Sequence, residues 1–204
     1  SRELYLGKYE VREITAPHGM VLNPEPHCVE LVYAGQNVAV TETATSFENE
    51  RQKVEISLVK SIEQNERFGI GTNGEMKNIS FGLFAAEEIV SASGTSIPAN
   101  GLVEIISLNE DGTAKIKTDL PFGSYYVQEL ATDSHYKLSD TKYPVTFGYA
   151  SQDTAVVKIA VNGGNAVENK LIYGSVSGKK IDENGDSLGG ALIGLFRTDD
   201  GEFT

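Results

Sequence analysis

Three side chains of this sequence, Lys60, Glu129 and Asn169, could together form a covalent bond. Lys60 follows Ile56 and Leu58 at every second position, so in a strand these side chains lie on one face. If that face is buried, desolvation lowers the pKa of the Lys60 amine toward the neutral form, which is a nucleophile. The alternation therefore predicts an inward lysine that could attack a carbonyl carbon.

The same alternation places Glu129 on the face of Tyr125 and Val127, and Asn169 lies near the end of the last predicted strand. A carboxyl group in an apolar site can stay protonated near neutral pH, because burial disfavours its charged form. The set predicts a reaction in which the Lys60 amine attacks Asn169 Cγ while Glu129 polarises the carboxamide and moves protons. Ammonia leaves, and an isopeptide bond joins the first strand to the last.

Two simpler interpretations of Lys60 stay open from the spacing alone. An alternating strand that ends in lysine is commonly an edge strand with a solvated charge. A salt bridge between Lys60 and Glu129 is the other alternative.

An internal repeat with a period near 116 residues supports the reactive interpretation. The period is the size of a domain and far exceeds the roughly 20–50 residues of solenoid repeats. The matching segments are Gly7–Glu13 with Gly123–Glu129, Tyr33–Gln36 with Tyr149–Gln152, Glu48–Asn49 with Glu168–Asn169, Lys60 with Lys180, and Phe81–Phe84 with Ile193–Phe196. The repeat therefore supplies Glu13, Asn49 and Lys180 as counterparts of the reactive residues.

The elements that must position these residues are short strands. Alternating runs are separated by Gly-rich and Asn/Asp-rich turns, which predicts an all-β sandwich or barrel. The runs are Val54–Lys60, Ala114–Lys117 and Tyr125–Glu129, and the best helical candidate, Ala85–Val90, is too short for a helical layer.

The register of the repeat predicts the domain boundaries. Residues 53–172 make one complete unit, residues 1–52 match only the second part of that unit, and residues 173–204 match only its first part. We therefore expect tandem β-sandwich domains, one complete and two partial.

Several segments resemble one known family. Leu120–Leu130 resembles the E-box of the Cna-B-type (SpaA-like) domains of Gram-positive adhesins and pilins, and Tyr9–Gly19 resembles it more closely, with the trailing Ala-Pro-x-Gly. Gly82–Ile89 resembles the family's second-strand segment. Gly174–Asp182 and then Leu188–Ala191 resemble its first strand and following turn. In order and spacing, the resemblance covers essentially the whole chain.

The resemblance implies all-β, tandem prealbumin- or Ig-like β-sandwich domains, with an isopeptide bond from Lys60 to Asn169 that is assisted by Glu129. The segment Leu130–Tyr136 departs from the family because it lacks the usual Ala-Pro after the glutamate. We also expect the partial domains to complement each other head to tail between chains, with Lys180, Glu13 and Asn49 as inter-chain equivalents. Only the register selects Lys180, rather than Lys179, as the inward lysine.

Charge and cysteine content exclude several classes of function. The 17 basic and 29 acidic side chains give a net charge of −12, which disfavours nucleic acids and anionic membrane surfaces as partners. The single cysteine excludes an internal disulfide and a CxxC redox site. Cys28 lies in an alternating run, where we expect it to be a small packed residue.

We expect neither a metal nor a cofactor. Asp182–Asp186 alternates oxygen ligands, but it lacks the glycine and the bidentate glutamate that a calcium loop requires, so a turn is predicted. His18, His27 and His135 have no metal-binding spacing.

The predicted function is structural: a stalk or spacer segment of a Gram-positive surface adhesin or pilin, with no enzymatic activity beyond its own cross-linking. The alternative is a module that binds a host extracellular-matrix ligand. The expected partners are neighbouring domains of the same array. No signal peptide or sorting signal occurs, so we expect an interior segment of an extracellular protein that is attached to the cell wall through other regions.

Overall fold

The computed structural model describes residues 4–91 and 93–196, so the end of the predicted 173–204 segment lies outside the described residues. The chain divides into two units, residues 1–171 and residues 172–204, and each is described by itself.

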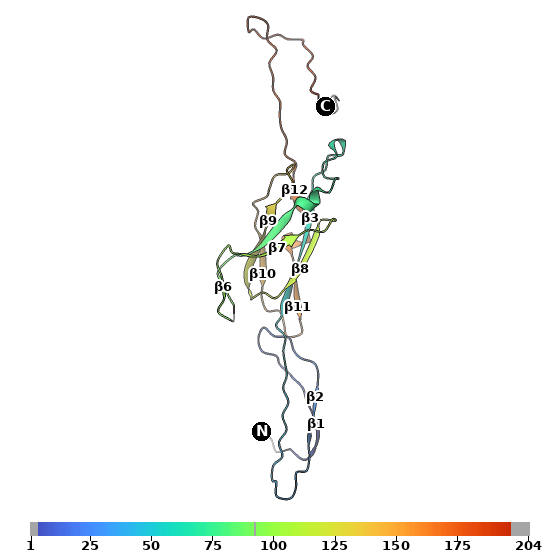
Figure 1. The fold of residues 1–204 in the computed structure, drawn as a ribbon, viewed down its shortest axis with the longest axis vertical. Helices are drawn as coiled ribbons and strands as arrows, with labels where there is room; N and C mark the ends of the chain where they lie inside the picture. Colours follow the sequence, from blue (N-terminus) through green and yellow to red (C-terminus); the bar gives the residue numbers. More distant parts are fainter. Residues whose placement is uncertain (1–3, 92, 197–204) are drawn as a thin grey trace. The chain divides into compact units, whose positions relative to one another are not determined.

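Residues 53–171 form two four-stranded sheets (Figure 1). One sheet contains β3 (Lys53–Ile62), β8 (Thr113–Thr118), β11 (Val156–Ala160) and β12 (Val167–Asn169). The other contains β4 (Ser80–Ala85), β7 (Leu102–Ser107), β9 (Gly123–Ala131) and β10 (Tyr143–Phe147). Apolar side chains of both sheets pack into a single core, so the predicted all-β sandwich is confirmed.

The first sheet is built around β3. β8 pairs with it antiparallel, while β11 pairs in parallel with Lys53–Ser57 and β12 pairs in parallel with Lys60–Ile62. The buried side chains of β3 alternate with more exposed ones over Val54–Lys60. Lys60 therefore points into the sandwich, as the sequence pattern predicts.

The remaining elements of this domain are short. They are the hairpin of β5 (Ile89–Val90) and β6 (Ser96–Ile97), and the 3₁₀ helices η1 (Glu66–Phe68), η2 (Glu75–Asn78) and η3 (Val161–Gly164). No helix among the described residues is long and apolar enough to span a membrane.

The helical candidate Ala85–Val90 is not a helix. β4 ends at Ala85, and the backbone N–H of Ala86 donates to the carbonyl of Ser124 instead of forming a helical turn. Ala85 and Ile89 are both buried, so their spacing of four residues reflects two separate strand contacts with one core.

The first part of the chain contains a hairpin of β1 (Gly7–Val11) and β2 (His27–Leu31). Gly7 is the partner of Leu31 in this hairpin, and Gly123 is the partner of Phe147 in the β9–β10 pair. Both partners are shifted by 116 residues, so the strand register repeats with the same period as the sequence.

The prediction that Cys28 is a packed residue is wrong, because its side chain is exposed. In β2 the half-buried positions are His27, Val29 and Leu31, so Cys28 falls on the outward face with Glu30. The alternation correctly predicts a strand, but it does not determine which face of the strand points inward.

The second unit contains little regular structure among residues 172–196. Ile181 and Ser187 form an isolated bridge around a turn in which the Asp182 carboxylate accepts hydrogen bonds from the N–H groups of Asn184 and Asp186. Many of its large apolar side chains are exposed, including Tyr173, Val176, Leu192, Ile193, Leu195 and Phe196.

Candidate functional site: a buried lysine, glutamate and asparagine

The Lys60 amine is buried in the core beside one carboxylate. Its residue is 3% exposed, and Nζ lies 3.5 Å from Glu129 Oε1 and 6.0 Å from the ring centroid of Phe81. Nζ has no hydrogen-bond partner among the described residues. Burial lowers the pKa of Lys60, and this effect outweighs the opposing attraction of Glu129. The neutral amine therefore forms more readily at this site than on a solvent-exposed lysine.

Glu129 projects from β9 into the space between Lys60 and Asn169. It is 4% exposed, and its carboxylate accepts two hydrogen bonds. Oε2 accepts from the backbone N–H of Ser139 at 2.9 Å, and Oε1 accepts from Asn169 Nδ2 at 2.8 Å. The backbone contact fixes the carboxylate so that one oxygen faces both the lysine and the asparagine.

Asn169 lies at the end of β12 and is 2% exposed. Its Nδ2 donates to Glu129 Oε1 and, at 2.9 Å, to Thr132 Oγ1. Its Oδ1 is buried with no hydrogen-bond partner among the described residues. The carboxamide is thus held by its nitrogen, the atom that would leave as ammonia.

The fold brings the three predicted residues together because β12 runs alongside the end of β3. Val167 is the direct partner of Lys60, so Asn169 lies two residues further along the parallel strand. Thr132 and Ser139 also contact the trio, and the sequence alone does not predict them. Thr132 follows Glu129 by three residues in the segment where the chain departs from the family pattern, and no periodicity marks it.

A second glutamate–asparagine pair lies in the first part of the chain. Glu13 Oε2 accepts from Asn49 Nδ2 at 2.7 Å and from the backbone N–H of Asn23 at 2.7 Å. Asn49 Nδ2 also donates to the carbonyl of Val21 at 2.9 Å. No ion pair joins Glu13 to a lysine within residues 4–91 and 93–196. Lys180 is exposed in the second unit, where Nζ donates to the carbonyl of Ile181.

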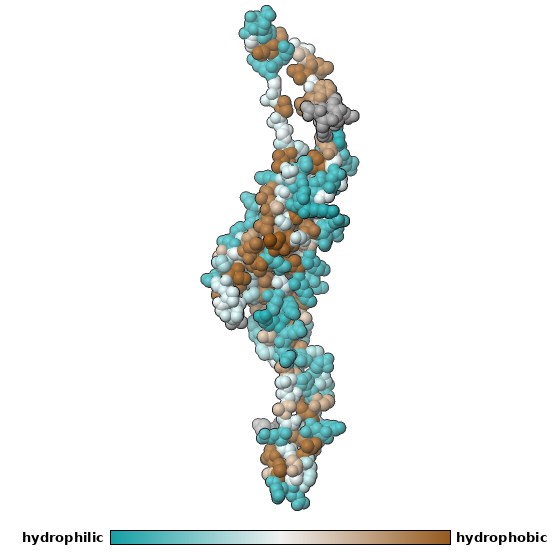
Figure 2. Space-filling model, in the orientation of Figure 1, coloured by the Kyte–Doolittle hydropathy of each residue, from teal (hydrophilic) through white to brown (hydrophobic). Residues whose placement is uncertain are grey.

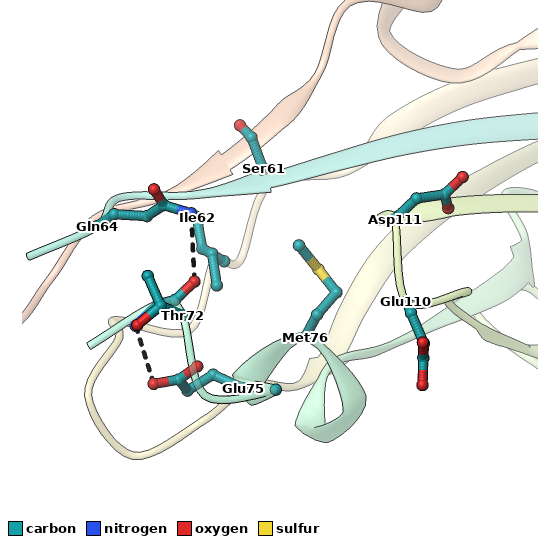
Figure 3. A pocket seen from close by; sticks show the side chains of 10 residues that line it. Ser61, Ile62, Gln64, Thr72, Glu75, Met76, Glu110 and Asp111 are labelled. Carbon is teal, nitrogen blue, oxygen red and sulfur yellow. Dashed lines mark hydrogen bonds between the residues drawn. The ribbon is translucent and has the colours of Figure 1, made fainter. Parts of the chain in front are cut away.

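A pocket of about 370 Å³ lies beside η2, separate from the buried trio (Figure 3). Figure 3 shows the side chains of Glu75 and Met76 on one side of it, with Glu110 and Asp111 on the other. Burial opposes ionisation of Glu75, but hydrogen bonds from backbone N–H groups, including those of Gly71 and Asn73, hold its pKa below the usual range. This carboxylate therefore holds the loop before η2. No cluster of metal-binding side chains occurs among the described residues.

Comparison with solved structures gives remote similarities. The TIE protein of Bacillus anthracis is 22% identical over 83% of this chain and 26% of its own, with a TM-score of 0.49. The minor pilin of Streptococcus agalactiae is 16% identical over 88% of this chain and 66% of its own, with a TM-score of 0.38. The major pilin subunit of Bacillus cereus is 18% identical over 58% of this chain and 29% of its own, with a TM-score of 0.31. The chain thus spans about a quarter of the length of the first of these proteins.

No match was found among curated protein sequences. A family model does match, and it covers residues 52–164, which include β3 to β11 with Lys60 and Glu129. Its description, a prealbumin-like fold domain, agrees with the sandwich of these residues. The chain belongs to the SpaA family of prealbumin-like fold domains.

Proposed function

We propose that this chain is a spacer segment of a Gram-positive surface adhesin or pilus, and that residues 53–172 lock themselves with an isopeptide bond between Lys60 and Asn169. The observation that carries the proposal is the buried trio. The Lys60 amine has no hydrogen bond among the described residues and lies 3.5 Å from Glu129 Oε1. The same oxygen accepts a hydrogen bond from Asn169 Nδ2, the nitrogen that would leave as ammonia.

In the proposed reaction, the neutral Lys60 amine attacks Asn169 Cγ. Glu129 takes a proton from the attacking nitrogen and returns it to Nδ2, since its Oε1 lies 3.5 Å from Nζ and 2.8 Å from Nδ2. The Nζ–Cγ bond forms, the Cγ–Nδ2 bond breaks, and ammonia leaves. Thr132 holds Nδ2 during this exchange.

Such a bond suits a domain that transmits tension. It joins the first strand of the domain to the last and closes a loop of 109 residues between Lys60 and Asn169. Force that enters before Lys60 and leaves after Asn169 would pass through the cross-link, so the intervening sandwich carries none of it. The role is structural, without an external substrate, and it places the protein outside the cell. Recognition of a host matrix ligand stays the alternative function.

Intact mass tests the bond directly. The wild-type chain should be lighter than its sequence mass by one ammonia, and peptide mapping should find Lys60 joined to Asn169. Lys60→Ala should restore the full mass. Lys115→Ala is the matched control, because this lysine lies on the neighbouring strand β8 with 64% of its side chain exposed. A wild-type chain at full mass would disprove the proposed bond.

A further inference from the structure

The carboxamide nitrogen of Asn169 has two hydrogen-bond acceptors, and one of them lies outside the trio. An asparagine Nδ2 carries two N–H groups. One donates to Glu129 Oε1 at 2.8 Å and the other to Thr132 Oγ1 at 2.9 Å. The last torsion angle of an asparagine side chain is otherwise broadly distributed, so these two bonds together fix the plane of the carboxamide.

The plane of the carboxamide decides whether the Lys60 amine can reach Cγ. An amine attacks the carbon from above or below this plane, and a small misplacement slows such a reaction strongly. Asn169 Oδ1 has no hydrogen-bond partner among the described residues, so no hydrogen bond there holds the oxygen side of the group. Glu129 is also the group that would move the proton, so its own bond to Nδ2 changes during the reaction. Thr132 is the contact that can hold the nitrogen throughout.

The loop that carries Thr132 is anchored by residues that do not touch the asparagine. β9 ends just before Thr132, and Asp133 follows it with a carboxylate that accepts from Asn78 Nδ2 at 2.7 Å. Tyr136 is 2% exposed, and its hydroxyl donates to the carbonyl of Glu63 at 2.9 Å. The Thr132 hydroxyl is therefore positioned by the fold before any bond forms.

The other copy of the repeat has no hydroxyl at this place. The residue 116 positions before Thr132 is Ala16, in the Ala-Pro-x-Gly segment of that copy. Its side chain cannot accept a hydrogen bond, and Asn49 Nδ2 finds its second acceptor in the backbone, at the carbonyl of Val21. In both copies the asparagine nitrogen thus has a glutamate and one further acceptor. The departure of the complete domain from the Ala-Pro pattern is what supplies this acceptor from a side chain.

Thr132 also lies at the edge of the buried site. Lys60, Glu129 and Asn169 are at most 4% exposed, so they add almost nothing to the molecular surface, one face of which is shown in Figure 2. Thr132 is half-buried and contacts Nδ2 directly. The nitrogen that would leave therefore already faces a residue that is partly exposed to solvent.

We propose that the Thr132 hydroxyl holds the Asn169 carboxamide for attack and accepts a hydrogen bond from the departing ammonia, so that Thr132 helps to set the rate of cross-linking. This inference rests on the bond proposed above between Lys60 and Asn169. As the Nζ–Cγ bond forms, Glu129 moves one proton from Nζ to Nδ2 and the Cγ–Nδ2 bond breaks. The N–H that Nδ2 donates to Thr132 Oγ1 is kept while ammonia forms.

The test follows the loss of ammonia by mass after the full chain is refolded. Thr132→Val keeps the branched shape but removes the acceptor, and it should slow bond formation by roughly 10–100-fold. Thr132→Ser keeps the hydroxyl and should restore a rate close to that of the wild type. Thr146→Val, the same substitution at an exposed position of β10, is the matched control and should leave the rate unchanged. Circular dichroism of the same samples measures folding, which should proceed alike in all of them.

Three results would overturn the proposal: a wild-type rate in Thr132→Val, a rate in Thr132→Ser as slow as that in Thr132→Val, or a delay in folding that accounts for the whole delay in bond formation. A wild type that keeps its full mass would instead refute the bond between Lys60 and Asn169.

The hydrogen bond itself is read in a background where no cross-link can form. In Lys60→Met, hydrogen exchange of the Asn169 side-chain amide followed by NMR should show protected Nδ2 hydrogens, and adding Thr132→Val should remove part of this protection. Unchanged exchange would refute the contact on which the proposal depends. Lost protection together with a wild-type rate of cross-linking would refute the role of Thr132 alone and leave the proposed bond in place.

Discussion

Replacement of Lys60 by methionine isolates the contribution of the cross-link to stability. The substitution removes the amine and keeps an unbranched side chain in a site that is 3% exposed. In the unlinked chain Nζ forms an ion pair with Glu129 Oε1 at 3.5 Å, but in the linked wild type the same nitrogen would be a neutral amide, so Glu129 has no lysine cation beside it in either molecule. Asn169 keeps its hydrogen bonds to Glu129 and Thr132. The variant therefore differs from the wild type chiefly in the bond.

The size of the effect follows from the loop that the bond closes. By analogy with a disulfide, a cross-link that closes a loop of about 100 residues restricts the unfolded chain and so stabilises the folded state by roughly 4–5 kcal/mol. A change of 1 kcal/mol moves Tm by roughly 2–8 °C for domains between about 60 and 250 residues. We therefore expect Lys60→Met to lower Tm by at least about 8 °C.

Thermal unfolding followed by circular dichroism measures this shift, with the mass of each sample recorded to show which molecules are linked. Lys115→Met, an exposed lysine on β8, should melt within about 2 °C of the wild type, as expected for a surface substitution. If the linked wild type and unlinked Lys60→Met melt together, the loop-closure argument is wrong even though the bond exists.

Three further outcomes are expected. Glu129→Gln keeps the shape of the side chain but cannot carry the proton, so bond formation after refolding should slow by roughly 10²–10⁴-fold in a mass time course; an unchanged rate would remove Glu129 from the reaction. In Asn169→Ala the bond cannot form, so Lys60 keeps its amine, whose pKa burial lowers from 10.5 in the folded state only. Between the lowered pKa and about 10.5 the unfolded state binds more protons than the folded state, so the free energy of unfolding in urea should rise with pH over that range. A free energy of unfolding that does not change with pH there would contradict the buried amine. Gly112→Ala should lower the free energy of unfolding in urea by more than about 1 kcal/mol, because its Cβ would collide with the Lys60 carbonyl. Gly74→Ala should lower it less, because Gly74 also has a positive φ but has open space around the added Cβ.

The sequence predicts the inward direction of Lys60 and Glu129 because a strand has a strict period of two, and one buried neighbour fixes the face of the others. Asn169 follows from the repeat, since its run is too short for periodicity to place it. Thr132 and Ser139 lie after the end of β9, where hydrogen bonds depend on tertiary folding and leave no periodic signal.

The prediction fails where a pattern is compatible with two arrangements. The run around Cys28 alternates as a strand should, but its sequence does not show which face of β2 points outward. Ala85 and Ile89 have helical spacing, yet Ala85 ends β4 and Ile89 begins β5, and both side chains pack into the same core. In both places, packing against residues distant in sequence determines which side chains are buried, and a short stretch of sequence carries no information about that packing.

The parallel pairing of β3 with β11 and β12 also bears on the order of folding. As the chain is made, β3 is complete long before residues 156–169, so its edge stays unpaired until β11 and β12 are present. Contacts so distant in sequence make folding slow, because the loop entropy is lost before the contacts form. Lys60 is therefore kept from Asn169 until nearly the whole domain is present. Incomplete molecules would stay unlinked, so the proposed covalent bond would mark only domains that have finished folding.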